Sequence, residues 1–214
     1  MIIAFEGIDG SGKTTLMNRL QKYFNGNGGN IKRMSPGNLD IGAYVYEMSP
    51  DNLDIGAYVY ERVNAMNYCS TTKLLANLAA LNEISEYVDS LQLKETSVFF
   101  DRYYFSTYAY NTTKENISIF EEAIKHMVKP DLTIILYIDY ETYCKRLNER
   151  GEVPLSEKEF NSIQQKYHNA SDYVFSEHKI YEVTSNNPDS VFETVKAELE
   201  IFLTQKTYLV KDVF

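Results

Sequence analysis

Short apolar runs alternate along the chain with segments whose apolar residues recur at helical spacing. The apolar runs fall at residues 2–5, 97–100, 132–138 and 180–183, and each is followed by a helix candidate. Residues 14–24, for example, carry Leu16, Leu20 and Tyr23 at intervals that place them on one helix face. Such alternation is typical of a parallel sheet covered by helices on both faces. We therefore expect an α/β fold of three layers, with a central parallel sheet of about five strands flanked by helices.

The turn between the first strand and the first helix has the pattern GxxxxGKT, within FEGIDGSGKTT at residues 5–15. Glycines allow backbone turns that are closed to other residues, so that successive amide groups point at phosphate oxygens. A glycine-rich turn that matches by chance is the alternative, and the strand and helix on either side argue against it. The pattern predicts an ATP site formed by Gly7, Ile8, Asp9, Gly10, Ser11, Gly12, Lys13, Thr14 and Thr15.

Two side chains of this loop have chemistry of their own. Lys13 adds a positive charge that can reach the outer phosphates of the nucleotide, which makes it a candidate catalytic residue. The hydroxyl of Thr14 can hold the Mg²⁺ that accompanies those phosphates. The helix that begins near Gly12 directs the positive end of its dipole at the same anion.

A second candidate site is DRYYFSTYAY at residues 101–110, directly after the apolar run SVFF. Parallel strands deliver their functional residues at their C-terminal ends, so Asp101 is expected near the phosphates as a catalytic and magnesium-organising group. Arg102 can bind a second phosphate through two parallel hydrogen bonds. The tyrosines, Tyr103 and Tyr110 among them, offer flat surfaces to a base or a sugar. The alternative is an ion pair at a strand end followed by a partly buried aromatic helix.

A third segment, KPDLTIILYIDYETYCKRLNERG at residues 129–151, runs from a turn through a buried strand into a helix and a polar loop. Arg146 and Arg150 lie four residues apart and share a helix face. Beside a transferring phosphoryl group these arginines would neutralise the developing charge, whereas on a surface helix they would only be solvated. Arg150, at the helix end before Gly151, is the better catalytic candidate.

Residues 34–47 and 48–61 are a tandem repeat, MSPGNLDIGAYVYE and MSPDNLDIGAYVYE, which differ only at Gly37 and Asp51. Pro50 favours a helix start in the second copy, with Ser49 as its cap. We expect a long helix from about residue 52 to about residue 91, and a loop or short helix in the first copy. The leucines of that helix serve as core or as a dimer face, and a duplicated substrate loop is the functional alternative.

Length and composition fit one catalytic domain that spans residues 1–214. The net charge of -9 argues against a general nucleic-acid or membrane surface. Cys69 and Cys144 have no metal-ligand spacing, and so few thiols suit a reducing compartment, which makes a cytoplasmic location the default. We expect no secretory signal, because Glu6 interrupts the first apolar run, and no membrane-spanning segment.

In order and approximate spacing, the three segments resemble the signatures of thymidylate kinases, over roughly residues 1–195. The resemblance implies a P-loop kinase fold and phosphoryl transfer from ATP to deoxythymidine monophosphate (dTMP), with Mg²⁺, in a homodimer. By the same resemblance Asp9 would face the acceptor sugar, Arg102 the acceptor phosphate and Tyr110 the ribose ring, with Tyr103 beside them. Residues 150–167 would form a mobile lid.

The resemblance also implies where the remaining cations and the donor base lie. Family members without an arginine in the phosphate loop usually carry the catalytic one on the lid. Ser11 stands in this loop and no arginine does, so Arg150 and Lys158 are the available lid cations. The segment EVTSNNPDSVFETV resembles the strand, loop and helix that hold the adenine, which points to Asn186 and Asn187.

Two departures from the family pattern concern the acceptor. The run of arginine, glutamate, proline and glycine usual after the second strand is replaced here by Arg33 and MSPG, which leaves Arg33 as the candidate phosphate contact. Ala76 and Ala80 occupy the places of a phenylalanine and an arginine that contact the thymine. A site that lacks a hydrogen-bonding arginine loses discrimination between bases, so another pyrimidine deoxynucleotide remains open as the acceptor.

Two rival functions come from other classes. A deoxynucleoside kinase would need a general base at a 5′-hydroxyl and no arginine for an acceptor phosphate. A P-loop switch or binding module would need a guanine-reading NKxD segment, and the sequence contains none. Comparison of thymidine with its monophosphate as acceptor separates the first rival from the kinase expected here.

Overall fold

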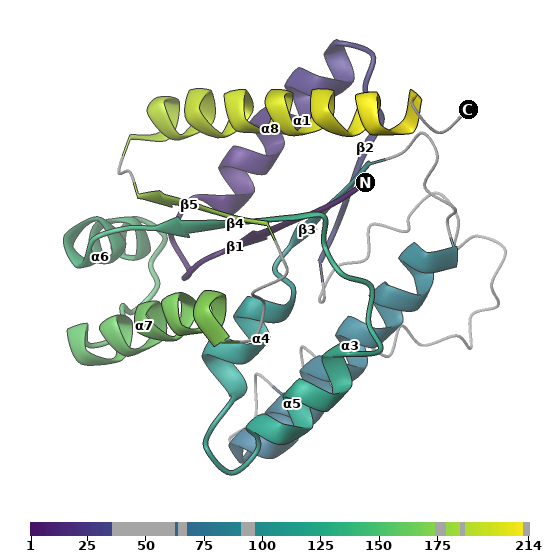
Figure 1. Ribbon diagram of the computed structural model, residues 1–214. Coiled ribbons are helices and arrows are strands. Elements are labelled where there is room, and N and C mark those ends of the chain that lie inside the picture. The colour runs from purple at the N-terminus through teal and green to yellow at the C-terminus, as the bar shows by residue number, and fades with distance from the viewer. Residues whose placement is uncertain (36–62, 64–67, 91–96, 174–178, 185–186, 212–214) are drawn as a thin grey trace, which may run out of the picture.

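The computed structural model describes residues 1–35, 63, 68–90, 97–173, 179–184 and 187–211. A five-stranded sheet with the order β2-β3-β1-β4-β5 lies at its centre, and all neighbouring strands are parallel (Figure 1). The strands are β1 (Ile2–Glu6), β2 (Ile31–Met34), β3 (Ser97–Asp101), β4 (Leu132–Tyr137) and β5 (Ile180–Thr184). Phe5 of β1 pairs with Asp101 of β3, so the segments after these two strands begin side by side.

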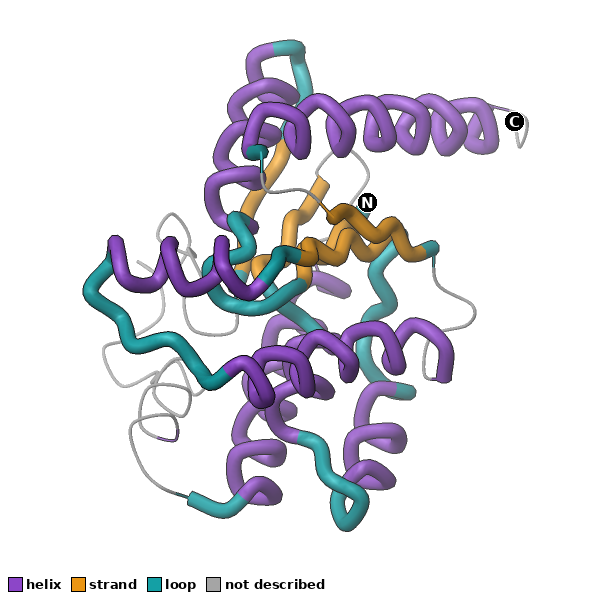
Figure 2. Tube along the Cα trace, turned by 90° about the vertical axis from the view of Figure 1, so that its left-hand side faces the viewer, coloured by secondary structure: helices purple, strands orange, loops and turns teal. Residues whose placement is uncertain are grey.

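Helices cover both faces of this sheet (Figure 2). One face carries α1 (Lys13–Gly26) and α8 (Pro188–Lys211), and the other carries α3 (Ser70–Ser90), α4 (Tyr104–Asn111) and α5 (Ile117–Ile124). Two further helices of the described residues, α6 (Tyr140–Glu149) and α7 (Glu157–Tyr173), follow β4. This arrangement confirms the three-layer α/β fold and the number of strands expected from the sequence.

Alternation of side chains along the strands divides the core in two. In β1, Ile3 and Phe5 pack with residues of α1 and α8, whereas Ile2 and Ala4 pack with residues of α3, α4 and α5. Successive residues of a strand point to opposite faces, so a central strand buried on both sides must be apolar throughout. Three of the apolar runs noted in the sequence are therefore the central strands β1, β3 and β4, whereas the fourth, β5, lies at one edge of the sheet and is only partly buried.

The long helix expected from about residue 52 is wrong in extent. Tyr68 and Cys69 are not helical, and α3 begins at Ser70. Its leucines at positions 74, 78 and 81 are buried in the core, and Leu75 is 51 % exposed. Of the repeat and the chain up to residue 67, only Met34, Ser35 and Val63 are among the described residues, and Val63 is helical.

Candidate active site

The loop between β1 and α1 is wrapped tightly against the end of β4. Gly7 has a φ of 133°, and a Cβ there would lie 2.4 Å from the carbonyl oxygen of Leu136. Gly10 has a φ of 74°, and its Cβ would lie 2.8 Å from Cδ1 of Leu147. Residues with side chains rarely adopt such backbone angles. Glycine is thus required at positions 7 and 10 by the path of the backbone.

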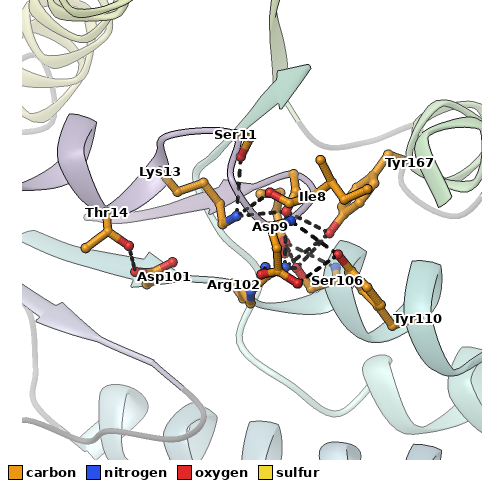
Figure 3. A network of polar contacts seen from close by, with 12 residues as sticks. Ile8, Asp9, Ser11, Lys13, Thr14, Asp101, Arg102, Ser106, Tyr110 and Tyr167 are labelled. Carbon is orange, nitrogen blue, oxygen red and sulfur yellow. Dashed lines mark hydrogen bonds and ion pairs between the residues drawn. The ribbon is translucent and has the colours of Figure 1, made fainter. Parts of the chain in front are cut away.

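Lys13 is folded back over this loop, as Figure 3 shows. Its Nζ donates to the carbonyl oxygens of Gly7 and Ile8, both at 2.9 Å, and lies 3.3 Å from the hydroxyl oxygen of Ser11. The side chain is 6 % exposed. Burial, together with the charge of Arg102, lowers the pKa of Lys13 to about 7, against the opposing influence of nearby carboxylates. A phosphate would replace neutral carbonyl partners with charged ones.

Asp101 ends β3 beside the first turn of α1. Its Oδ2 accepts a hydrogen bond of 3.1 Å from the hydroxyl of Thr14 and lies 3.2 Å from Nη2 of Arg33. Arg33 also donates to the side chain of Asn18. Arg33 belongs to β2 and does not follow it, and it is not among the residues that line the cavity described below. In this structure Arg33 therefore pairs with the carboxylate of Asp101 and does not face the cavity in which a phosphate would lie.

Arg102 follows β3 in a left-handed backbone conformation, with φ of 74°. Its backbone N–H donates to the carbonyl of Phe5 at 3.0 Å. Its Nη1 donates to the carbonyl of Gly7 at 3.1 Å, and its Nη2 forms an ion pair with Asp9. Because a residue with a side chain is strained at this φ, tertiary contacts must hold it there. In this backbone conformation the guanidinium lies against the phosphate loop.

Asp9 lies between Arg102 and Tyr110. The hydroxyl of Tyr110 donates to the carboxylate at 3.3 Å and accepts from the backbone N–H of Asp9 at 3.3 Å (Figure 3). Partial dehydration raises the pKa of Asp9, but the charges of Arg102 and Lys13 outweigh it and hold that pKa below its usual value. Burial raises the pKa of the Tyr110 hydroxyl. Asp9 is thus an acceptor and Tyr110 a donor at neutral pH.

Tyr103, expected at the acceptor, is instead part of the core. Its side chain is 1 % exposed, and its hydroxyl donates to the carbonyl of Val128 at 3.0 Å. Its ring stacks on Phe100 with centroids 4.6 Å apart and on Tyr104 with centroids 4.0 Å apart. Both ring faces are covered, so stacking on an acceptor base or sugar is not supported for this residue. The start of the segment therefore matches the alternative considered from the sequence, a partly buried aromatic helix after β3.

A cavity of about 330 Å³ opens above the phosphate loop. It brings together most of the residues predicted from the sequence. These are Asp9, Gly10, Gly12, Lys13, Thr14, Thr15, Asp101, Arg102 and Arg150. Ile8 and Ser11 are not among its lining residues and are 1 % and 5 % exposed respectively. The loop, the end of β3 and the end of α6 therefore form one site.

Arg146 and Arg150 contact this loop from α6. Nη1 of Arg146 donates to the carbonyl of Gly10 at 2.8 Å, so Arg146 is not merely solvated. Arg150 follows the last turn of α6 and lines both the main cavity and a smaller one of about 100 Å³. The smaller cavity extends from the loop to Pro188 and Val191 at the start of α8. Of the two arginines, Arg150 is the one that faces both spaces.

The adenine contacts expected near the C-terminus are only partly described. Asn186 lies outside the described residues. Asn187 accepts hydrogen bonds from the backbone N–H groups of Asp189 and Ser190, at 2.9 and 3.1 Å. Its side-chain oxygen therefore caps α8, because it accepts hydrogen bonds from backbone N–H groups of the first turn that have no partner within the helix.

The residues at this site fit a magnesium ion with few protein ligands. Thr14 and Asp101 present a hydroxyl and a carboxylate oxygen to the same cavity. Mg²⁺ prefers such oxygen ligands and keeps several waters and substrate oxygens. Among the described residues no group of three or more His, Cys, Asp or Glu side chains is placed to hold a metal. The donor set thus suits an ion that arrives with a nucleotide.

Three buried polar residues next to the site were not among the site residues predicted from the sequence. Glu6, Ser106 and Tyr167 form a buried polar group beneath Arg102, with exposed fractions of 0 %, 7 % and 0 %. The hydroxyl of Tyr167 donates to the carbonyl of Gly7 at 3.1 Å. The signal available was Glu6, a charged residue at the end of an otherwise apolar strand, where burial demands partners.

The sequence profile of the thymidylate kinase family matches residues 5–195. The chain belongs to this family. It is 28 % identical to the thymidylate kinase of Mycoplasmopsis pulmonis, over 100 % of this chain and 94 % of that protein. It is 32 % identical to the thymidylate kinase of Thermosipho africanus, over 66 % and 67 % of the two chains. As a thymidylate kinase family member the chain is a nucleoside monophosphate kinase, a phosphotransferase.

Solved thymidylate kinase structures share its fold. The structure from Candida albicans superposes with a TM-score of 0.62 at 18 % identity, and covers 96 % of this chain and 92 % of its own. The structure from Ehrlichia chaffeensis gives 0.62 at 22 % identity, over 95 % and 98 % of the two chains. Among the described residues, the helices are too short or too polar for a membrane span.

Proposed function

We propose that this thymidylate kinase family member transfers the γ-phosphoryl group of ATP to dTMP. The observation that supports this most directly is the position of Arg102 against the phosphate loop, with Nη1 on the Gly7 carbonyl and Nη2 paired with Asp9. A deoxynucleoside kinase has no need of an arginine there, because its acceptor carries no phosphate. An arginine fork beside a phosphate loop is suited to two phosphorylated ligands.

The donor phosphates would lie in the loop of residues 7–15. Their charge would draw Lys13 away from the carbonyls of Gly7 and Ile8, which are its partners without a ligand. The N-terminal end of α1 would direct its backbone N–H groups at the same oxygens. The protein's contribution is alignment and neutralisation of charge, since phosphoryl transfer requires little covalent chemistry from side chains.

The acceptor would lie between the loop and α4. Arg102 would exchange its pair with Asp9 for the acceptor phosphate, and the freed Asp9 carboxylate would accept from the sugar hydroxyl. Tyr110, which already bonds Asp9, would stand beside the ribose and exclude a 2′-hydroxyl. Arg33 would have to leave Asp101 to reach a phosphate, so its role is secondary.

Thr14 and Asp101 would hold Mg²⁺ on the donor side. When bound, the ion supplies positive charge to the β- and γ-phosphate oxygens and so favours transfer. Arg33 lies 3.2 Å from the Asp101 carboxylate and would compete with a cation there. Binding of the metal would therefore displace the guanidinium of Arg33, which belongs to β2, from Asp101.

The lid would comprise residues 150–167, with Arg150 as its catalytic cation and Lys158 exposed nearby. The end of this segment is anchored, because Phe160 and Tyr167 are 2 % and 0 % exposed. Val153, in the loop before α7, is 91 % exposed. We therefore place the movement in the loop and the first turn of α7, with closure excluding water from the transfer.

A homodimer and a cytoplasmic location complete the proposal. The exposed Leu75 on α3 is a candidate for a dimer face. Cys69 and Cys144 are free thiols, as a reducing compartment requires.

A coupled assay of ADP release tests this function. The purified chain is given ATP, Mg²⁺ and, in turn, each deoxynucleoside monophosphate and thymidine. We expect dTMP to be the best acceptor and thymidine to be inactive. Activity with thymidine alone would make the chain a deoxynucleoside kinase, and ATP binding without any acceptor would make it a nucleotide-binding switch.

A second acceptor is favoured by the residues of α3. Ala80 is 1 % exposed and packs in the core, and Ala76 is half-buried. Neither offers a hydrogen bond from its side chain to a base. Phosphorylation of another pyrimidine deoxynucleotide at a rate close to that of dTMP would show that this chain reads the base weakly.

A further inference from the structure

Glu6 is a charged residue placed wholly inside the protein, at the last position of β1 and directly before the phosphate loop. Its carboxylate accepts from the backbone N–H groups of Tyr103, Phe105 and Ser106, at 2.7, 3.1 and 3.1 Å. It also accepts from the hydroxyl of Ser106. These backbone groups lie at the start of α4, where N–H groups have no partners within the helix. Glu6 therefore fixes α4 to the end of β1.

Ser106 connects this carboxylate to Arg102. A serine hydroxyl has one proton to donate, and here it goes to Glu6. The oxygen then accepts from Nη1 of Arg102 at 2.9 Å. The same Nη1 lies 3.1 Å from the Gly7 carbonyl. With Nη1 fixed in this way, the guanidinium is oriented so that Nη2 points at Asp9 and the cavity (Figure 3).

The backbone on both sides of Arg102 is hydrogen-bonded to the end of β1. On one side its own N–H donates to Phe5, and on the other the N–H of Tyr103 donates to Glu6. Both acceptors belong to the last two residues of β1. These bonds hold Arg102 at a φ that a residue with a side chain rarely adopts.

We propose that Glu6 and Ser106 are positioning residues for the acceptor phosphate and act through Arg102. Neither is among the residues lining the main cavity, so their effect on a ligand is indirect. Glu6 sets the direction of the hydrogen bonds that run from Arg102 through Ser106 to the carboxylate. This inference rests on the proposed function, in which Arg102 binds the phosphate of the acceptor.

Two substitutions separate the parts of this arrangement. Ser106→Ala removes the hydroxyl that joins Glu6 to Arg102 and leaves the three backbone hydrogen bonds of Glu6 intact. Glu6→Gln keeps the size of the side chain, removes its charge and allows its amide group to donate to Ser106, which reverses that bond. Ser85→Ala is the matched control, because Ser85 is also a buried serine, 3 % exposed, and bonds the backbone N–H of Val128.

The experiment measures kcat, KM for dTMP, KM for ATP and the unfolding temperature of the wild-type chain and the three variants. We expect Ser106→Ala to raise KM for dTMP by about tenfold, the loss expected for one hydrogen bond to a charged group. KM for ATP should stay within about twofold of the wild-type value. Glu6→Gln should raise KM for dTMP further. Ser85→Ala should lower the unfolding temperature and leave both KM values unchanged.

An unchanged KM for dTMP in Ser106→Ala, with a fall in unfolding temperature like that of Ser85→Ala, would show that the serine only stabilises the fold and would overturn the proposal. An equal rise of both KM values would overturn it as well, because the effect would then lie in the shared loop. If Glu6→Gln does not fold, Ser106→Ala alone decides. A wild-type chain that phosphorylates no deoxynucleoside monophosphate refutes the proposed function, and that result is read before any variant is made.

Discussion

Thr14 and Asp101 share a hydrogen bond of 3.1 Å between Oγ1 and Oδ2, although they are far apart in the sequence. The contact joins the first turn of α1 to the end of β3, since β1 and β3 are neighbours in the sheet. Two oxygen ligands for a hard cation are thereby placed at the edge of one cavity. The parallel register of β1 and β3 is what creates this pair.

Asp101→Asn should weaken the response to magnesium. The amide keeps the size of the side chain but removes the charge that attracts the cation and holds Arg33. We expect the Mg²⁺ concentration for half-maximal activity to rise by at least about tenfold, as measured by titration of the ADP-release assay. Glu122→Gln, at an exposed carboxylate paired with Lys125, is the control and should leave that concentration unchanged. If both variants needed the same Mg²⁺ concentration for half-maximal activity, Asp101 would not be a ligand of the ion.

Arg150→Ala and Arg146→Ala should affect different kinetic constants. Arg150 faces both cavities, so its loss should lower kcat by roughly 10²–10³-fold and change KM for ATP little. Arg146 bonds the Gly10 carbonyl, so its loss should loosen the loop and raise KM for ATP. Steady-state kinetics of both variants decide the assignment. A larger fall of kcat in Arg146→Ala than in Arg150→Ala would mean that Arg146 acts in the transfer and Arg150 supports the loop.

The sheet and the phosphate loop were predictable because their patterns are local. A buried parallel strand is apolar along its whole length, and the glycines of the loop are fixed by backbone geometry at positions such as Gly7. The extent of α3 was not predictable in the same way. Ser49 and Pro50 favoured a helix start within the repeat, yet Tyr68 and Cys69 are not helical, because tertiary packing rather than local propensity fixes where a helix starts.

The parts of the site that sequence reasoning missed depend on burial. Tyr103 and Tyr110 both follow β3 in one aromatic segment, yet Tyr103 packs in the core and Tyr110 bonds Asp9. Seven residues on a helix of 3.6 residues per turn are almost two turns, so spacing alone places both on a similar face. Glu6 and Tyr167 meet through the fold, 161 residues apart, and only three-dimensional packing shows that both contact Ser106.

Gly7→Ala should destabilise the protein more than Gly28→Ala. Both glycines have positive φ, but a Cβ at Gly28 meets nothing within 4 Å, whereas one at Gly7 would meet the Leu136 carbonyl at 2.4 Å. The positive φ alone costs about 1–2 kcal/mol at Gly28, where φ is 87°, and at least as much at Gly7, where φ is 133°. Urea unfolding should show a further loss of about 1–3 kcal/mol for Gly7→Ala, from the clash. Equal losses would mean that the end of β4 moves freely away from the loop.

The chain should discriminate weakly between pyrimidine bases. A site built to hydrogen-bond a substrate rejects an analogue that lacks the partner by about 10⁴–10⁵-fold. The side chains of Ala76 and Ala80 supply no such bond, so we expect kcat/KM for dTMP to exceed that for the deoxycytidine monophosphate by roughly 10²-fold or less. The ratio is measured with both acceptors in one reaction. A ratio near 10⁴ would require another side chain to read the base.

Lys13 should make ATP binding dependent on pH. Its pKa is about 7 without ligand, because burial and Arg102 disfavour the charged form. Bound phosphates favour that form and raise the pKa, so above pH 7 ATP binding must take up a proton. The apparent Kd for ATP should therefore increase as the pH rises above 7, by at most about tenfold per pH unit. Calorimetry in buffers of different ionisation enthalpy measures the proton uptake directly.

The same shift has a defined sign for stability. The ordinary pKa of a lysine is 10.5, so between about pH 7 and pH 10.5 the unfolded chain binds a proton that the folded, ligand-free chain does not. Stability should then rise with pH across that window, while the cost of burying Lys13 is complete below pH 7. Lys13→Met keeps the apolar stem and removes the titrating group. If this variant showed the same proton uptake and the same pH-dependent unfolding as the wild type, the titration would belong to another group.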